Sequence, residues 1–122
     1  MAKLLVVDDE LEICDFLKNF FGKAGFEVFS ATNGQEAIST IDEERPQIAL
    51  LDIKMPGISG IEVLRRAKEI DHNIKIIMVT GVEDEEMVNL AKEYGASDYI
   101  TKPFSLDYLE NSVLSKLLAL LS

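Results

Sequence analysis

Five short apolar runs alternate along the chain with five segments in which apolar residues recur at helical spacing. Each run is bounded by charged or turn-forming residues, which favours a strand that is buried on both faces. The expected strands are residues 4–7, 27–31, 48–52, 75–79 and 98–101. Regular alternation of strand and helix is typical of a parallel sheet with helices on both faces and right-handed crossovers. The sequence therefore predicts a doubly wound α/β fold.

Capping residues mark where several helices are expected to begin. Asn33 is followed three residues later by Glu36, which is the pattern of a capping box. Later helices are expected to be capped by Ser59, Asp84 and Ser105. Gly95 is expected to end the fourth helix, and the fifth is expected from about Leu106 to Leu121. In the third helix, Val63 is expected at the edge of the apolar stripe.

Polar side chains stand at the ends of four of the expected strands. They are Asp8, Asp9, Asp52, Thr80 and Lys102. Parallel strands leave a sheet along one edge, and open α/β sheets bind ligands there, so we expect these side chains to converge. Each has an ordinary explanation by itself, because Asp often starts a turn and Lys-Pro is often part of one. Their joint placement favours a functional site.

The three carboxylates of this set indicate a cation site. Carboxylates held close together repel one another, so without a cation at least one pKa must rise. Oxygen ligands without histidine or cysteine suit Mg²⁺, Mn²⁺ or Ca²⁺ and disfavour Zn²⁺. Mg²⁺ usually takes one or two protein carboxylates, keeps water and also binds substrate phosphate. We therefore expect Mg²⁺, with Mn²⁺ as an alternative.

The remaining members of the set suit a phosphoryl group held against that metal. Lys102 adds a positive charge and Thr80 a hydroxyl donor, while Gly81 lets its backbone N–H approach an anion closely. No Ser, Cys or His nucleophile with an obvious base stands at this edge. The available covalent acceptor is a carboxylate, and aspartyl phosphates are known chemistry. Asp52 is the expected acceptor because it projects from the central strand, which leaves the other two aspartates for the metal.

Composition narrows the choice of partner. The 122 residues are expected to form one domain, and the net charge of -10 argues against nucleic acid or an anionic membrane surface as a direct partner. Cys14 is the one cysteine, so no internal disulfide forms. The apolar run near the N-terminus is too short for a signal peptide, and no segment has the length of a membrane span. A cytoplasmic location is expected.

Four motifs in order carry a resemblance to a known family. They are Val6-Val7-Asp8-Asp9-Glu10, Leu51-Asp52-Ile53-Lys54-Met55-Pro56-Gly57 with Gly60, Val79-Thr80-Gly81, and Gly95-Ala96 through Asp98-Tyr99-Ile100-Thr101-Lys102-Pro103-Phe104. In this combination the chain resembles the receiver domain of bacterial two-component response regulators, and the resemblance covers essentially all of residues 1–122. It implies a flavodoxin-like sheet with strand order 2-1-3-4-5.

The resemblance also implies roles for the residues at the edge of the sheet. Asp52 would take a phosphoryl group from a phosphohistidine on a sensor histidine kinase or a histidine phosphotransfer protein. Asp9, Asp52 and the backbone carbonyl of Lys54 would bind Mg²⁺, with Asp8 reaching the metal directly or through water. Thr80 and Lys102 would contact the phosphoryl oxygens. The peptide bond between Lys102 and Pro103 is expected to be cis.

Further residues are expected to govern the response to phosphorylation. By the family's switch, Thr80 would move toward the phosphoryl group and Tyr99 would turn inward. The face formed by the fourth helix, fifth strand and last helix would then control an output domain or a partner protein. Lys54 and Val82 lie two residues after Asp52 and Thr80, and the resemblance implies that these two positions border the path of the hydrolytic water. Because Val82 cannot orient a water and Lys54 would cover the phosphoryl group, a fairly long-lived phosphoryl state is expected.

The leucines of the last helix exceed the needs of one buried stripe. They are Leu114, Leu117, Leu118, Leu120 and Leu121. One hypothesis is a homodimer formed through the last helices, and another is the beginning of a linker to an output domain.

Two other functions remain to be weighed against the switch. A Mg²⁺-dependent phosphohydrolase can also use an aspartyl phosphate, but such enzymes usually carry a second Asp where this chain has Lys54. A nucleotide-binding protein would need a Gly-rich phosphate loop or a Rossmann fingerprint, and neither occurs. We therefore expect that the protein is not an enzyme that acts on other substrates. It would catalyse only its own phosphorylation and dephosphorylation.

Overall fold

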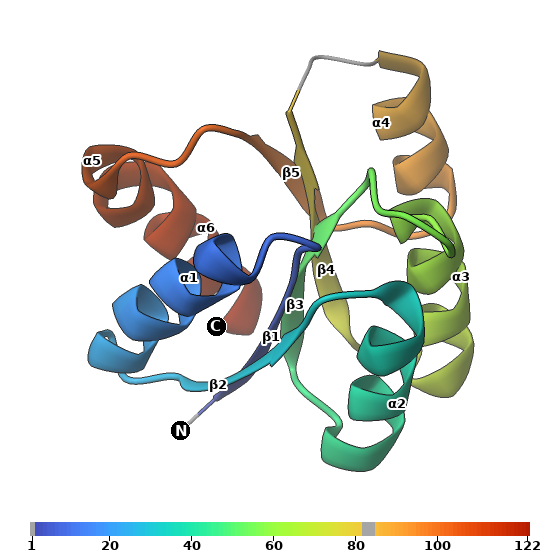
Figure 1. Ribbon diagram of the computed structural model, residues 1–122, viewed down its shortest axis with the longest axis horizontal. Coiled ribbons are helices and arrows are strands. Elements are labelled where there is room, and N and C mark those ends of the chain that lie inside the picture. The colour runs from blue at the N-terminus through green and yellow to red at the C-terminus, as the bar shows by residue number, and fades with distance from the viewer. Residues whose placement is uncertain (1, 82–84) are drawn as a thin grey trace.

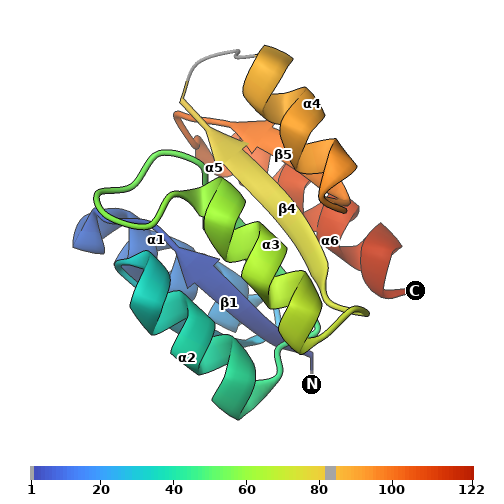
Figure 2. The ribbon, with the colours of Figure 1, turned by 90° about the vertical axis from the view of Figure 1, so that its right-hand side faces the viewer.

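The computed structural model describes residues 2–81 and 85–122. Within them, one parallel sheet occupies the middle of the molecule (Figures 1 and 2). Its strands are β1 (Lys3–Val7), β2 (Glu27–Ala31), β3 (Ile48–Asp52), β4 (Lys75–Thr80) and β5 (Asp98–Thr101). The strand order is β2-β1-β3-β4-β5, and every neighbouring pair is parallel. This arrangement confirms the predicted flavodoxin-like sheet.

Helices cover both faces of the sheet. They are α1 (Leu11–Lys23), α2 (Gly34–Glu44), α3 (Gly60–Ile70), α4 (Glu85–Glu93) and a last helix made of α5 (Leu106–Tyr108), a π-helical segment η1 (Leu109–Val113) and α6 (Leu114–Leu121). Helix α1 and the last helix lie on one face, and α2, α3 and α4 lie on the other (Figure 1). No helix among residues 2–81 and 85–122 is long and apolar enough to span a membrane.

Alternate residues of a strand pack into two separate hydrophobic cores, one on each face of the sheet. Leu4 and Val6 of β1 pack with α1 and the last helix, whereas Leu5 and Val7 pack with the helices of the opposite face. This follows from the period of two in a strand, which sends successive side chains to opposite faces. All residues of β3 are buried, as expected for the middle strand. Val63 is fully buried in the second of these cores, which corrects its expected place at the edge of the α3 stripe.

The predicted helix caps are present where the structure describes them. Asn33 Oδ1 accepts a hydrogen bond from Glu36 N at 2.9 Å, although the Glu36 carboxylate reaches back to Thr32 N and not to the capping residue itself. Two hydroxyls act in the same way in later helices, those of Ser59 and Ser105. Asp84 lies outside the described residues. Gly95 follows α4 with a φ of 98°, a left-handed conformation that favours glycine.

The last helix differs from the uninterrupted α-helix that the sequence predicts. Its buried residues Leu109, Val113 and Leu117 are four apart, and each is fully buried. In an α-helix of 3.6 residues per turn, positions four apart drift by roughly 40° around the axis at each step. A π turn uses i→i+5 hydrogen bonds and takes more residues per turn, so it reduces this drift. The π segment Leu109–Val113 thus keeps the three side chains directed at the core.

Candidate functional site

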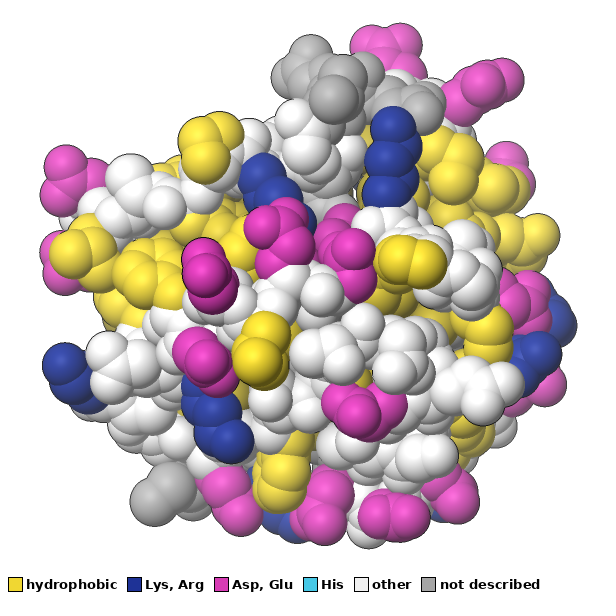
Figure 3. All heavy atoms as spheres, in the orientation of Figure 1, with side chains coloured by type: hydrophobic (Ala, Val, Ile, Leu, Met, Phe, Trp, Pro, Cys, Tyr) yellow, Lys and Arg dark blue, Asp and Glu magenta, His cyan; other side chains and the backbone are white. Residues whose placement is uncertain are grey.

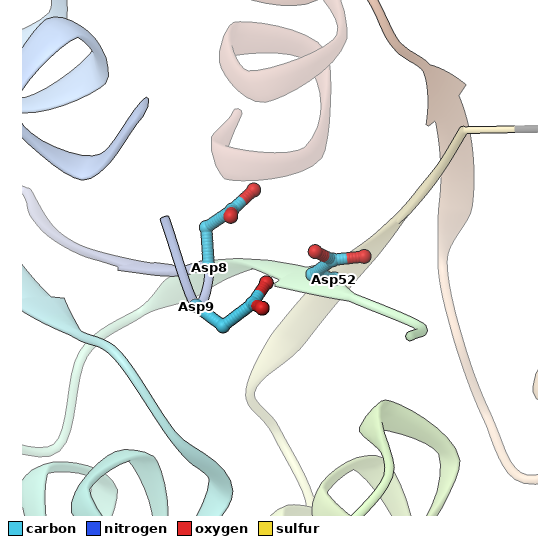
Figure 4. Close-up of side chains that lie close together, drawn as sticks. All are labelled: Asp8, Asp9 and Asp52. Carbon is cyan, nitrogen blue, oxygen red and sulfur yellow. The ribbon is translucent and has the colours of Figure 1, made fainter. Parts of the chain in front are cut away.

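Three carboxylates meet at the carboxyl ends of β1 and β3 (Figure 4). Asp8 and Asp9 follow β1, and Asp52 is the last residue of β3. A carboxylate oxygen of each lies within 4.8 Å of the others. Asp8 and Asp52 are buried, whereas Asp9 is exposed. The structure therefore brings together the acidic residues that the sequence placed at this edge of the sheet, and Asp9 forms the open side of the group.

The ammonium group of Lys102 bridges two of these carboxylates. Its Nζ lies 2.6 Å from Asp8 Oδ2 and 3.2 Å from Asp52 Oδ2. Lys102 directly follows β5, and its backbone N–H donates to Thr80 O at 2.8 Å, so the last bond of the β4–β5 ladder sets where its side chain starts. The shorter of the two ion pairs is the one with Asp8, which sequence reasoning did not anticipate because no local pattern indicates it.

Burial and charge act against each other at this cluster. Burial raises the pKa of Asp52, and the charge of Asp8 raises it further, while Lys102 and the N–H of Lys54 oppose the rise. For Lys102, burial lowers the pKa, but hydrogen bonds and charge from Asp8 and Asp52 outweigh it and the pKa is raised. The Lys102 ammonium thus pairs with two of the three carboxylates, and the group of these four side chains keeps an excess of negative charge.

Backbone groups hold the two buried carboxylates in place. Asp8 Oδ1 accepts a hydrogen bond from Glu10 N at 2.9 Å, and Asp52 Oδ1 accepts one from Lys54 N at 3.2 Å. Both bonds run from a residue two positions later, as in an Asx turn. Each leaves Oδ2 for Lys102. The Asp8 turn was not predicted, although an Asp followed by a short polar stretch is a signal that could have indicated it.

Gly60 permits the close approach of α3 to the end of β3. A Cβ on Gly60 would collide with the backbone carbonyl oxygen of Asp52 and would lie 2.8 Å from Ile53 Cα. The backbone N–H of Gly60 donates to Ile53 O at 3.0 Å. The first turn of α3 therefore fixes the backbone from which the Asp52 carboxylate projects.

The other predicted site residues that the structure describes lie at or just after the ends of the neighbouring strands β4 and β5. Thr80 is buried at the end of β4 and pairs with Thr101 across the ladder, while Gly81 is exposed with no atom within 4 Å of the place where a Cβ would stand. The Lys102–Pro103 peptide bond is cis. Val82 lies outside the described residues.

Tyr99 lies in β5 and faces outward. Its side chain is 37% exposed, and the Lys92 ammonium of α4 sits 5.8 Å from the centre of its ring. This contact has the geometry of a cation–π interaction. Tyr99 therefore has the outward orientation. The expected switch would turn its side chain inward from this position.

The donor set fits a hard divalent cation. The cluster offers carboxylate oxygens and, within the described residues, neither histidine nor a cysteine thiol belongs to it. Mg²⁺ prefers such oxygen ligands and retains several waters, which the open side at Asp9 allows. A bound cation would also offset the excess negative charge that one lysine leaves.

Comparison with known proteins gives consistent matches over most of the chain. Residues 4–114 match the family model of the response regulator receiver domain. Sporulation initiation phosphotransferase F of Bacillus subtilis (strain 168) is 42% identical over 111 residues, which is 91% of this chain and 90% of that protein.

Two solved structures are similar over nearly their whole length. A CheY-like response regulator receiver domain protein from Methanospirillum hungatei has a TM-score of 0.89 at 33% identity, with 98% of this chain and 96% of that chain covered. The response regulator TrrA from Thermotoga maritima, solved in complex with Mg²⁺ and BeF, has a TM-score of 0.84 at 32% identity, with 98% and 99% covered.

Proposed function

The chain belongs to the response regulator receiver domain family, and on that basis we propose that it is a phosphoacceptor switch whose Asp52 accepts a phosphoryl group from a phosphohistidine. The observation that carries the proposal is the buried Asp52 carboxylate, which lies in one cluster with two further carboxylates and the Lys102 ammonium. We assign the whole of residues 1–122 to one receiver domain acting in the cytoplasm, without direct contact to nucleic acid or membrane.

Phosphoryl transfer forms one bond and breaks one. An oxygen of the Asp52 carboxylate attacks phosphorus, the P–N bond to the donor imidazole breaks, and its electron pair stays on the imidazole nitrogen. Lys102 then leaves its carboxylate partners and neutralises the phosphoryl oxygens, assisted by the Thr80 hydroxyl and the Gly81 N–H. Such a reaction depends mainly on positioning and charge stabilisation.

The metal belongs to the same proposal. Asp8, Asp9, Asp52 and the backbone carbonyl of Lys54 would hold Mg²⁺, and Mn²⁺ would substitute for it. When bound, the ion supplies positive charge against the phosphoryl oxygens. The presence of Mg²⁺ and BeF in the similar TrrA structure supports this assignment.

The partner that delivers the phosphoryl group must approach the edge of the sheet where Lys102 lies. Apolar side chains gather on the surface over α1 and α5 (Figure 3). Among the residues of these two helices, Leu11, Phe16 and Leu106 are exposed. A cavity of about 290 Å³ lies between Phe16, Pro103 and neighbouring residues. We place the docking site of the sensor histidine kinase or histidine phosphotransfer protein on this surface, because exposed apolar patches beside a reactive group mark contact sites.

The output of the switch is assigned to α4, β5 and the last helix. Phosphorylation draws Thr80 toward the phosphoryl group, and Tyr99 turns inward from the outward orientation seen here. The altered face then binds an output domain or a downstream protein. A Tyr99→Ala variant that is phosphorylated normally and keeps its full output response would contradict this part of the proposal.

Labelling with acetyl phosphate and Mg²⁺ tests the phosphoacceptor function. We expect one phosphoryl group per chain, and none in Asp52→Ala. Sustained multiple turnover of acetyl phosphate would favour the alternative, a Mg²⁺-dependent aspartyl-phosphate phosphohydrolase. The exposed Lys54 side chain beside Asp52 favours the switch, because it places a cation where such a hydrolase needs an acid/base carboxylate. Lys54 and Val82 follow Asp52 and Thr80 by two residues in the sequence and are the basis for the expected long lifetime, which decay of the phosphoryl group within seconds would contradict.

Metal binding is tested on the unphosphorylated protein. Mg²⁺ at a hundredfold excess over its dissociation constant should raise the free energy of unfolding by about 2.7 kcal/mol. Asp9→Asn should lose most of this stabilisation, because Asp9 lies at the open side of the cluster. Asp15→Asn, on the exposed surface of α1, is the matched control and should retain it. Equal stabilisation of both variants would reject Asp9 as a ligand.

A further inference from the structure

Tyr108 contacts both ends of the segment that carries Lys102. Its phenol oxygen accepts a hydrogen bond from Thr101 N at 3.1 Å, and its ring stacks on Phe104 with centroids 6.5 Å apart and planes 14° apart. Lys102 and Pro103 lie between these two contacts. Tyr108 is itself held in place, because its backbone N–H donates to Ser105 Oγ at 3.0 Å.

The hydrogen bond from Thr101 to Tyr108 uses a backbone N–H that the sheet leaves unpaired. β5 is an edge strand, so alternate N–H groups point away from β4. Lys102 N donates to Thr80 O within the ladder, and the preceding N–H, that of Thr101, therefore faces outward. Without the Tyr108 hydroxyl, the Thr101 N–H would lose the side-chain acceptor that the structure shows for it.

A second contact from the last helix holds the other end of β5. Tyr99 N, the next outward-facing N–H, donates to Asp98 Oδ1 at 2.8 Å. The same carboxylate accepts a hydrogen bond from Lys116 Nζ, also at 2.8 Å. The last helix thus reaches the outer edge of β5 with two side chains, Tyr108 and Lys116.

The π segment explains how one helix makes both contacts. Tyr108 and Lys116 are eight residues apart, which in a regular α-helix would set them roughly 80° apart around the axis. The π segment Leu109–Val113 lies between them and turns through a smaller angle per residue. It therefore brings Lys116 back toward the side of the helix that carries Tyr108. Local π turns often occur at functional sites. Here the turn lets the last helix contact β5, the strand that precedes Lys102.

We propose that Tyr108 is a positioning residue for phosphoryl transfer to Asp52, because it holds the Thr101–Phe104 segment so that the Lys102 ammonium bridges Asp8 and Asp52. The proposal rests on the phosphoacceptor function assigned above. Tyr108 touches neither carboxylate and acts only through the backbone of Thr101 and the ring of Phe104.

Loosening Lys102 has two opposite consequences. A bound Lys102 competes with a cation for Asp8 and Asp52, so its release should strengthen Mg²⁺ binding to the resting protein. The same release takes away the charge that must meet the phosphoryl oxygens, so phosphorylation should slow. General destabilisation of the fold would weaken both, and the two measurements together therefore separate positioning from a purely structural role.

The test uses Tyr108→Phe in the full chain, because this change removes the hydroxyl and keeps the stacked ring. We expect faster amide hydrogen exchange at Thr101, Mg²⁺ binding about two- to twelvefold tighter, and acetyl phosphate labelling slower by a similar factor, the range expected for one net hydrogen bond. Tyr108→Leu removes the ring contact as well and should enlarge all three effects. Tyr94→Phe, a partly exposed tyrosine beyond the end of α4, is the matched control and should change none of them.

Unchanged exchange at Thr101 in Tyr108→Phe would overturn the proposal, as would a joint loss of Mg²⁺ affinity and labelling rate. Exchange and Mg²⁺ affinity are measured on the unphosphorylated protein. If the wild-type chain proved not to be labelled at Asp52, the phosphoacceptor function would fall, whereas these two readouts would still decide whether Tyr108 positions Lys102.

Discussion

At the scale of single residues, the buried carboxyl group of Asp52 couples function to stability. Burial raises the pKa of Asp52 above its ordinary value of 3.8. The folded protein therefore keeps a proton on Asp52 at pH values where the unfolded chain has lost it. By linkage, the free energy of unfolding falls as the pH rises above about 3.8 through the raised value. The ionised Asp52 carboxylate is thus maintained at a cost in stability.

Asp52→Asn should remove this cost. We expect the variant to melt at a higher temperature than the wild type at pH 7 in the presence of EDTA, because no charge is then buried at this position. The difference should shrink as the pH is lowered and vanish below 3.8, where the wild-type carboxyl is protonated in both states. Thermal unfolding at a series of pH values measures it. A difference that stays constant across the series would contradict the explanation.

Position 60 has no room for a side chain, because α3 packs closely against the end of β3 there. In Gly60→Ala the new Cβ would meet the backbone of Asp52 and Ile53, so either α3 or the end of β3 must shift. We expect a loss of about 2–4 kcal/mol in the free energy of unfolding, at the upper end of ordinary point mutations, together with slower labelling at Asp52. Denaturant unfolding and acetyl phosphate labelling check the two effects.

Gly22→Ala is the matched control for that substitution. Gly22 lies in α1 with no atom within 4 Å of its potential Cβ. Alanine should stabilise the helix there, by up to about 1 kcal/mol, since glycine is the poorer helix former. Equal destabilisation by both substitutions would mean that the contact with Asp52 is not the cause.

At the scale of elements, α4 and β5 are joined by the contact between Lys92 and Tyr99. The contact holds the tyrosine ring outward, and an exposed cation–π interaction is worth about 0.5–1 kcal/mol. Under the proposed switch, Lys92→Gln should favour the inward orientation by roughly two- to fivefold. The affinity for beryllofluoride with Mg²⁺ should rise by that factor. Lys18→Gln in α1 removes an equal charge away from Tyr99, and a similar rise in that variant would reject the contact as the cause.

At the scale of the whole molecule, the exposure of the leucines in the last helix decides whether the chain has an apolar surface for a dimer. Leu117 is fully buried, while Leu114, Leu120 and Leu121 pack partly against the core. Leu118 alone among these five leucines is strongly exposed, at 55%. The second apolar stripe that motivated the dimer hypothesis is therefore narrow in this conformation.

We accordingly expect a monomer in the resting state. If beryllofluoride induces a dimer through the last helices, Leu118→Glu should abolish it, because it would place a charge at the exposed leucine of the interface. Light scattering with and without beryllofluoride measures both. A strict monomer in both states would reject the dimer hypothesis, and a dimer that tolerates Leu118→Glu would move the interface to another face.

The features that could be predicted from the sequence are those with a local signal. Continuous apolar runs in the strands and caps such as Asn33 and Ser59 mark elements within a few residues of chain. Alternation of the elements then implies a parallel sheet, and a parallel sheet gathers the strand ends that carry Asp8, Asp52 and Lys102. The fold and the composition of the cluster therefore follow from the order of residues alone, and the resemblance to receiver domains supplied the individual roles.

The tertiary structure decided what depends on distances between segments far apart in the sequence. Lys102 pairs more closely with Asp8 than with Asp52, and the Tyr108 hydroxyl finds the open N–H of an edge strand. The π turn that aligns Tyr108 with Lys116 forms because Leu109, Val113 and Leu117 all pack against the sheet. No run of residues encodes these contacts by itself, because each arises only when side chains from different elements compete for the same space and the same hydrogen-bonding groups.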